Sequence, residues 1–340
     1  MEESFKNKTV VFDKFGGPEV LRVITKDIPE ADGVHIRIKV KAIGFNRAEA
    51  LYRNGLFVDV PREYPASLGL ECSGIVDAIG DLVPKGRFKI GDSVSILPCL
   101  RQSDYSTYSE YVIFPYQCIT LNPPEMSHTD ASSVWLAYLT AYYGFNDVAQ
   151  VKPGDYVVVT AASSSAGLAA IQLLKCTFKA RVIAVSRTSK KKDKIIFYGA
   201  HHFISMEESP DLYEAISIVT GDEGVSIIYD CVGGDITNGL SKTLKKYGHY
   251  ILYGLLNPTP TTFPILEAFI KYINFKGYII FEYSTRPDKL AEGNMFLLEQ
   301  FSKHQFKSIV GKKFQGIENV SEAHKYLELY DLFGKTVVEL

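Results

Sequence analysis

One stretch near the middle of the chain restricts the possible folds more than any other. Residues 156–160 run apolar without alternation, which is typical of a strand buried on both faces of a sheet. A loop of small residues follows directly, and the pattern beyond it predicts a helix over 167–178. A buried strand, a tight loop and a helix in this order indicate a parallel α/β sheet.

The same alternation continues to residue 254, whereas the chain before residue 125 has a different pattern. Further strands are predicted at 181–185, 202–205, 225–230 and 250–254, with helices that include 212–220 and 236–246. Earlier, Val34–Lys41 alternates apolar and polar residues, and shorter strands are expected at 74–79, 93–97 and 108–114. Short strands separated by turns indicate a compact barrel-like domain. The 340 residues are enough for two domains, with a boundary near residue 130.

Composition and charge exclude several classes of protein. Apolar residues make up 46 % and charged residues 22 %, which is ordinary for a globular protein. With 37 basic and 39 acidic residues and no basic block, nucleic acid and anionic membrane are not expected as partners. No apolar run has the length of a membrane helix, and Met1–Lys6 does not resemble the start of a secretory signal. Five cysteines without a CxxC pair fit the reducing cytoplasm, where we expect the protein.

The loop after residue 160 lies where a phosphate-binding loop must lie, between a buried strand and a helix N-terminus. Small residues allow a diphosphate to approach the backbone, and the helix supplies unpaired N–H groups. The alternative is a tight turn in an α/β domain that binds no cofactor. The expected contacts are Ser163, Ser164, Ser165, Ala166 and Gly167.

The end of the next strand indicates which nucleotide would bind. An NAD site usually has Asp or Glu here to bind the ribose 2′-hydroxyl. This chain has Ser186, Arg187 and the run Lys190–Lys192 instead, which suits a 2′-phosphate and therefore NADP(H). We expect Ser186, Arg187 and Lys191 to contact that phosphate. The alternative is a solvated helix face.

Seven short motifs occur along the chain in a fixed order. They are Phe15–Leu21, Gly69-Leu70-Glu71 with Gly74, Gly80 and Val83, Lys89–Val94, Tyr108–Val112, Ala161 with Ser164 and Gly167, Asp230–Gly234, and Gly334–Val338. In this order the motifs resemble the medium-chain dehydrogenase/reductase superfamily, in its zinc-free quinone oxidoreductase branch of zeta-crystallin-like proteins. The resemblance covers essentially the whole chain.

The resemblance implies a fold and an assembly. Residues 1–130 and 286–340 would form a GroES-like β-barrel catalytic domain, and residues 131–285 an inserted doubly wound Rossmann domain that binds NADP(H). A late apolar strand over 274–283 would pair with its copy in a homodimer. Further cofactor contacts implied in this way are Thr140, Val232, Tyr253, Gly254 and Phe281.

Departures from the family pattern bear on the chemistry. The positions of the catalytic zinc ligands hold Asn46, Leu70 and Leu136, which cannot replace two Cys and one His, so no metal is expected. The resemblance places Asn46 beside the nicotinamide. Enoyl reductases of the branch have a Tyr where this chain has Phe57, although Tyr52 is near enough to substitute for it.

Arg53 lies in the same expected cleft segment, residues 46–57. It is either a ligand of a polar substrate end or of the cofactor, or one partner of a surface salt bridge. With Asn46 and Tyr52 it completes the set of candidate catalytic residues.

These observations predict an NADPH-dependent reductase that transfers a hydride to a quinone or another conjugated carbonyl, an enal or enone, without metal. The substrate would be small and apolar. Three alternatives stay open: an enoyl-thioester reductase of the same branch, a protein that binds NADPH without catalysis, and a zinc alcohol dehydrogenase with unusual ligands.

Overall fold

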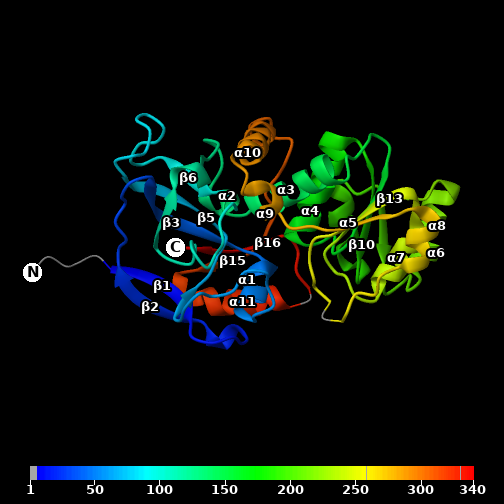
Figure 1. Cartoon of the computed structure of the whole chain (residues 1–340), viewed down its shortest axis with the longest axis horizontal. Helices are drawn as coiled ribbons and strands as arrows, with labels where there is room; N and C mark the ends of the chain where they lie inside the picture. Colours follow the sequence, from blue (N-terminus) through cyan, green and yellow to red (C-terminus); the bar gives the residue numbers. More distant parts are fainter. Residues whose placement is uncertain (1–5, 258, 330) are drawn as a thin grey trace, which may run out of the picture. The chain divides into compact units, whose positions relative to one another are not determined.

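The computed structural model describes residues 6–257, 259–329 and 331–340. Residues 1–5, where we expect no secretory signal, lie outside the described residues. Contacts within the chain divide it into two compact units, Met1–Leu136 with Tyr283–Leu340 and Ala137–Glu282. Figure 1 shows that the blue first segments and the red last segments belong to the same unit. The extent of the cofactor domain, 131–285, stays a prediction.

The first unit is built from a three-stranded and a seven-stranded sheet. The larger sheet has the order β15-β16-β3-β5-β6-β8, with β7 paired to β3, so that strands from both ends of the chain meet on β3. The elements of this unit are β1 (Lys6–Phe12), β2 (Arg22–Asp27), β3 (His35–Phe45), α1 (Arg47–Arg53), β4 (Ala66–Ser67), β5 (Glu71–Ile79), β6 (Ser93–Ile96), β7 (Tyr111–Pro115), β8 (Ile119–Leu121), α2 (His128–Ala131), α10 (Pro287–Ser302), β15 (Val310–Gln315), α11 (Val320–Glu328) and β16 (Lys335–Glu339).

The second unit contains a six-stranded sheet in which every pair is parallel. Its order, β11-β10-β9-β12-β13-β14, is that of the doubly wound Rossmann sheet predicted from the sequence. The elements are α3 (Trp135–Tyr143), which begins in the first unit, β9 (Tyr156–Val159), α4 (Ser165–Leu173), β10 (Arg181–Ser186), α5 (Lys192–Phe197), β11 (His202–Ser205), α6 (Leu212–Thr220), β12 (Val225–Asp230), α7 (Ile236–Thr243), β13 (Leu244–Leu252), α8 (Ile265–Lys271), β14 (Asn274–Gly277) and α9 (Phe281–Ser284), which ends in the first unit.

Burial explains why these segments form a sheet core. Val158, Ile183, Ile228 and Tyr250 come from four neighbouring strands and are almost fully buried in one cluster. β-branched side chains without polar alternation suit strands covered on both faces. At the reversal of strand order, between β9 and β12, the carboxyl ends of the strands form the usual ligand edge of such a sheet.

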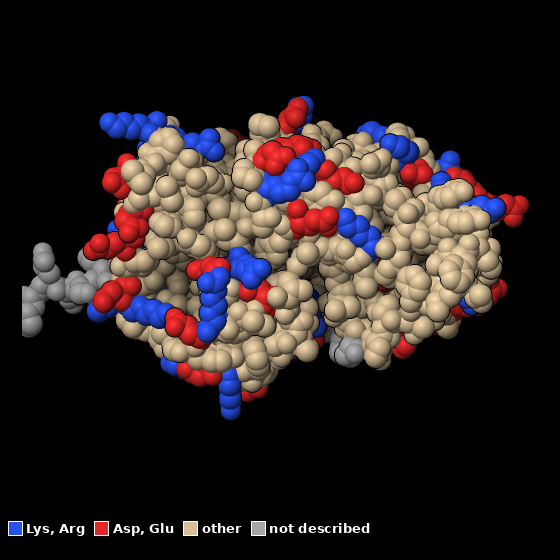
Figure 2. Space-filling view, in the orientation of Figure 1, with Lys and Arg blue, Asp and Glu red and all other residues tan. Residues whose placement is uncertain are grey.

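The predicted strand at 274–283 is wrong in extent and character. β14 ends at Gly277, its residues are exposed or half-buried, and Ile280 is buried beyond the strand. α9 follows at Phe281. Exposed apolar side chains of this region lie instead on and beside α8: Phe263, Ile265, Leu266, Phe269, Ile270 and Tyr272. Figure 2 shows few charged side chains on the surface around α8.

The observed bounds of two further helices differ from the predicted ones. The predicted helix 236–246 ends at Thr243, because β13 begins at Leu244 and extends to Leu252. The predicted helix 167–178 begins two residues earlier and continues into a π-helical turn, Leu174–Phe178. Within the described ranges, no helix has the length and apolar character needed to cross a bilayer.

Candidate functional site

The loop between β9 and α4 has the geometry of a helix N-terminus open to an anion. Ser164 is the N-cap of α4, and its Oγ accepts a hydrogen bond from the Gly167 N–H at 3.0 Å. Ala161 adopts φ +44°, an unusual conformation for a residue with a side chain. Because the first N–H groups of a helix have no intrahelical partner, those of Ser165 and Ala166 stay available.

Gly167 permits this tight turn. A Cβ there would lie 2.6 Å from the Ala161 carbonyl oxygen and 2.8 Å from the Ala162 Cα. These are backbone atoms, so a larger residue would force the loop away from the helix. The sequence motif has Ser164 where the family has its middle glycine, and the structure gives that serine a capping function.

Asp230 joins the carboxyl ends of three strands at this edge. It is fully buried, and its carboxylate accepts from Thr160 Oγ1 at 2.6 Å and from Tyr250 Oη at 2.8 Å. The N–H groups of Val232 and Gly233 donate to the same carboxylate at 2.8 and 3.0 Å. Sequence reasoning quoted Asp230 only as part of a motif and assigned it no role.

Ser186 and Arg187 lie at the end of β10, on the same edge of the sheet. The Ser186 Oγ is buried and has no hydrogen-bond partner within the described residues, while Arg187 is exposed. A buried hydroxyl without a hydrogen-bond partner is unfavourable, unless a bound ligand forms a hydrogen bond with it. Together with the turn at Gly167, it fits a nucleotide whose 2′-phosphate lies beside β10.

The other predicted cofactor residues have mixed positions. Val232 follows β12, and Tyr253 and Gly254 follow β13, so that all three lie at the carboxyl edge. The Tyr253 ring stacks on Tyr229 with centroids 3.9 Å apart. Thr140 lies in α3 and Phe281 begins α9; both are half-buried. Lys191 is half-buried in the turn before α5. Their contact with a cofactor stays a prediction.

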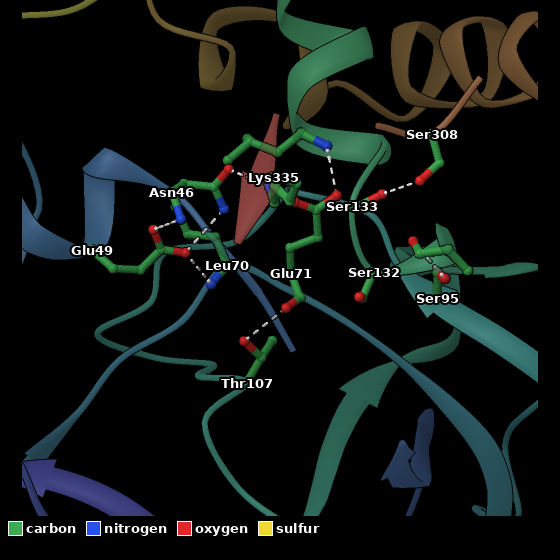
Figure 3. A network of polar contacts seen from close by, with 12 residues as sticks. Asn46, Glu49, Leu70, Glu71, Ser95, Thr107, Ser132, Ser133, Ser308 and Lys335 are labelled. Carbon is green, nitrogen blue, oxygen red and sulfur yellow. Dashed lines mark hydrogen bonds and ion pairs between the residues drawn. The ribbon is translucent and has the colours of Figure 1, made fainter. Parts of the chain in front are cut away.

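In the first unit, Asn46 belongs to a network of buried charges (Figure 3). The Lys335 Nζ lies 2.6 Å from Asn46 Oδ1 and 2.5 Å from Glu71 Oε2. On its other side, Asn46 donates from its backbone N–H and from Nδ2 to the Glu49 carboxylate, at 2.8 and 3.1 Å. Glu49, Glu71 and Lys335 are at most 1 % exposed.

The backbone N–H groups of two predicted zinc-ligand positions also face these carboxylates. Leu70 N donates to Glu49 and Leu136 N donates to Glu71, each at 3.2 Å. The positively charged member of this network is Lys335. Across the described ranges, no three His, Cys, Asp or Glu side chains are grouped to hold a metal ion.

Glu49 is the member of the network that titrates near neutral pH. Burial raises the pKa of Glu49 to about 7, against the opposing effects of its hydrogen bond from Asn46 and the charge of Lys335. Glu49 was not singled out from the sequence, and Glu71 and Lys335 entered only as members of motifs, without a role at the site. The one local signal was the spacing of Asn46 and Glu49, which matches a capping box.

Arg53 and Tyr52 are placed differently from the sequence-based hypothesis. Arg53 is fully buried, and its guanidinium donates to the Gly16 carbonyl, His324 Nδ1 and Glu328. The surface salt bridge is wrong for Arg53, because the Arg53 side chain of its ion pair with Glu328 is fully buried. Contact of Arg53 with a substrate or cofactor stays a prediction. Tyr52 is 1 % exposed, and burial raises the pKa of its hydroxyl, which makes it a weaker acid.

A separate hollow of about 590 Å³ lies in the first unit, beside β8 and α10. Its described lining includes Leu97, Cys118, Leu121, Leu290 and Asn294, and none of the residues predicted for the site. This hollow is therefore distinct from the Asn46 network.

Each of the two units contains a segment that matches a known protein family. The family model of the alcohol dehydrogenase GroES-like domain matches residues 32–124, and that of the zinc-binding dehydrogenase matches residues 166–293. The predicted combination of a GroES-like and a Rossmann-type domain is thereby confirmed.

Three similar proteins illustrate the range of relatives. The human synaptic vesicle membrane protein VAT-1 homolog-like is 34 % identical over 74 % of this chain, which spans only 57 % of that protein. A probable quinone oxidoreductase of Schizosaccharomyces pombe is 30 % identical over 98 % of this chain and 97 % of its own length. The crystal structure of Escherichia coli quinone oxidoreductase complexed with NADPH has a TM-score of 0.88 and 26 % identity, covering 98 % of this chain and all of that one. The chain belongs to the quinone oxidoreductase branch of the medium-chain dehydrogenase/reductase superfamily.

Proposed function

We propose that the chain is an NADPH-dependent oxidoreductase that reduces quinones or other conjugated carbonyls. The observation that carries the cofactor assignment is the unpaired Ser186 Oγ beside exposed Arg187, at the carboxyl end of β10. A hydroxyl and a guanidinium bind a 2′-phosphate, whereas NAD sites use a carboxylate at this point. The likeness to the NADPH complex of the Escherichia coli enzyme supports the same cofactor.

Different residues of this chain bind the cofactor and stabilise the acceptor. The N–H groups at the start of α4 bind the diphosphate, and Arg187 binds the 2′-phosphate. NADPH supplies a hydride when it is bound. Asn46 presents an amide N–H to the oxygen of the acceptor, on which negative charge develops.

Conjugated acceptors suit this set of groups. Their electronic system spreads the negative charge that arrives with the hydride, so that one hydrogen-bond donor provides useful stabilisation. Lys335, whose ammonium group contacts Asn46, is bound to Glu71 and buried inside the unit. The proton that completes the reduction then comes from water, since Tyr52 is buried and weakly acidic.

A turnover screen tests the proposal. NADPH oxidation is followed with quinones, enals, enones and enoyl thioesters, before and after treatment with a chelator. We expect turnover with at least one quinone or enone, unchanged by chelation. Turnover with enoyl thioesters alone would instead assign the enoyl reductase alternative. Tight NADPH binding without any turnover would leave a binding protein, and zinc lost together with activity would restore the zinc enzyme.

We also propose that the protein is a cytoplasmic homodimer. β14 is the edge strand of its sheet, and α8 beside it exposes Leu266, Phe269 and Ile270 by 65 to 73 %. An unpaired sheet edge and a neighbouring helix with exposed apolar side chains favour association. A two-fold axis would bring two copies of the same surface together.

Light scattering tests the dimer. The native protein should have twice the monomer mass of 37.9 kDa, and Phe269→Glu should release monomers, because each dimer would bury two new carboxylates. Tyr213→Glu, at an exposed tyrosine of α6, is the matched control. A native mass near 37.9 kDa would remove the dimer and leave the reductase proposal intact.

A further inference from the structure

The chemistry of its neighbours fixes which way the Asn46 side-chain amide faces. An ammonium group can only donate hydrogen bonds, and an ionised carboxylate can only accept them. Lys335 therefore requires the Asn46 oxygen on its side, 2.6 Å away, and this orientation places the Nδ2 toward Glu49 on the other side, 3.1 Å away. A flipped amide would put an N–H against the Lys335 ammonium and an oxygen against the Glu49 carboxylate.

One amide hydrogen stays free in this arrangement. Nδ2 carries two hydrogens, and Glu49 accepts one of them. Throughout 6–257, 259–329 and 331–340, the second hydrogen has no further partner. Of the four side chains in the network, Asn46 alone is partly exposed. The network therefore ends in a single oriented donor.

We propose that Lys335 and Glu49 are positioning residues, which hold the Asn46 amide so that its free N–H points to the acceptor oxygen. This inference rests on the reductase function proposed above. Asn46 is the group that would touch the substrate, and Lys335 and Glu49 act through it. Glu71 has a supporting part, because it balances the buried Lys335 charge.

A structural role alone would not require Asn46. A buried ion pair such as Lys335–Glu71 can often be replaced by apolar residues without loss of stability. Here the lysine has a second bond to a half-exposed amide, and that amide is also tied through two N–H groups to Glu49. Preorganised donors of this kind are effective because no reorientation is needed during the reaction.

The test compares variants that separate charge balance from amide orientation. Lys335→Met removes both contacts of the lysine. Lys335→Met with Glu71→Gln removes the charge of both partners and leaves no unpaired buried charge. Glu71→Gln alone keeps the donor that faces Asn46. Lys313→Met, which removes an exposed lysine from β15, is the matched control.

We expect Lys335→Met and the double variant to lower kcat by about 10- to 100-fold, with the Kd for NADPH unchanged. Glu71→Gln should keep most of the kcat. If the double variant regains both stability and kcat, Lys335 serves only to neutralise Glu71 and the proposal is overturned.

Glu49→Gln supplies a second test if the lysine variants do not fold. A glutamine has one oxygen and one NH₂ where the carboxylate accepts three N–H groups, so one donor must lose its partner. The charged and titratable groups that act on Glu49 are Lys335, Glu71 and Tyr108. We expect a lower kcat and the loss of a pH-dependent step near 7. A wild-type kcat and an unchanged pH profile would overturn the proposal.

The orientation can also be observed without turnover. In the native protein, the side-chain amide signals of Asn46 in a nuclear magnetic resonance spectrum should be sharp and distinct, and Lys335→Met should shift them. If these signals behave as expected but the native protein reduces no acceptor, the reductase proposal fails and the orientation stands. If Lys335→Met leaves them unchanged, the orientation itself is refuted.

Discussion

The Asn46 network and the loop around Ser164 and Ser186 satisfy their polar groups in opposite ways. In the network, Lys335 and both carboxylates find partners inside the first unit, and little is left open except one amide hydrogen. At the sheet edge of the second unit, the Ser186 Oγ has no hydrogen-bond partner among the described residues, and the first N–H groups of α4 have no partner within the helix. One region is saturated by its own chain, and the other is completed by what it binds.

This difference separates two kinds of consequence. Removing a group from the saturated region leaves a buried partner without a bond, so the main loss is in the free energy of unfolding. Removing the Ser186 hydroxyl from the open region takes away a group that has no partner among the described residues, so the main loss is in affinity. Substitutions in the two regions can break or sharpen this comparison.

The largest effect is expected for Lys335→Met. It leaves the Glu71 carboxylate buried without its cation, which should lower the free energy of unfolding by about 3–5 kcal/mol. Urea denaturation measures the loss. Lys313→Met should stay within about 0.5 kcal/mol of the native protein, because Lys313 itself is exposed in its ion pair with Glu339. Equal losses in the two variants would show that the network is not a special source of stability.

The second effect concerns pH and Glu49. Since burial raises the pKa of Glu49 from 4.5 to about 7, the folded protein keeps a proton that the unfolded chain releases in this range. The free energy of unfolding should therefore fall as pH rises from about 4.5 to 7, by up to about 3 kcal/mol. Glu49→Gln should flatten that slope. An identical slope in the variant would show that other groups produce the dependence.

The third effect belongs to the open region. Arg187→Ala should weaken NADPH binding about tenfold or more, because a charge-assisted bond to phosphate contributes about 1.5–3 kcal/mol. NADH lacks the 2′-phosphate, so its affinity should not change and serves as the internal control. Titration of both nucleotides decides the point. A parallel loss for both would place Arg187 elsewhere in the site.

The smallest effects come from two serines at the same sheet edge. Ser164→Ala removes the N-cap of α4 and should cost about 1 kcal/mol in unfolding free energy. Ser186→Ala removes a hydroxyl that has no partner, so stability should hold while NADPH affinity falls by roughly 2- to 10-fold. Thermal unfolding with and without NADPH distinguishes the two. A destabilised Ser186→Ala protein would mean that its hydroxyl is already satisfied.

The sequence predicts the open region better than the saturated one, for a physical reason. A strand, a small-residue loop and a helix are neighbours in the chain, so their pattern shows where Ser163 to Gly167 must lie. In the network, Asn46 contacts Lys335, which lies 289 positions away in the sequence, and no local pattern predicts that contact. The burial of Arg53 could not be predicted for the same reason, because its partners His324 and Glu328 lie far along the chain.

The most direct test of the account is NADPH oxidation by the native protein with a simple quinone, compared with NADH under the same conditions. The account predicts that NADPH is consumed in step with quinone reduction, that chelation leaves the rate unchanged, and that NADH is used at least about tenfold less efficiently. Equal use of the two nucleotides would contradict the assignment of Ser186 and Arg187. Absence of NADPH consumption with every conjugated acceptor would contradict the reductase function itself.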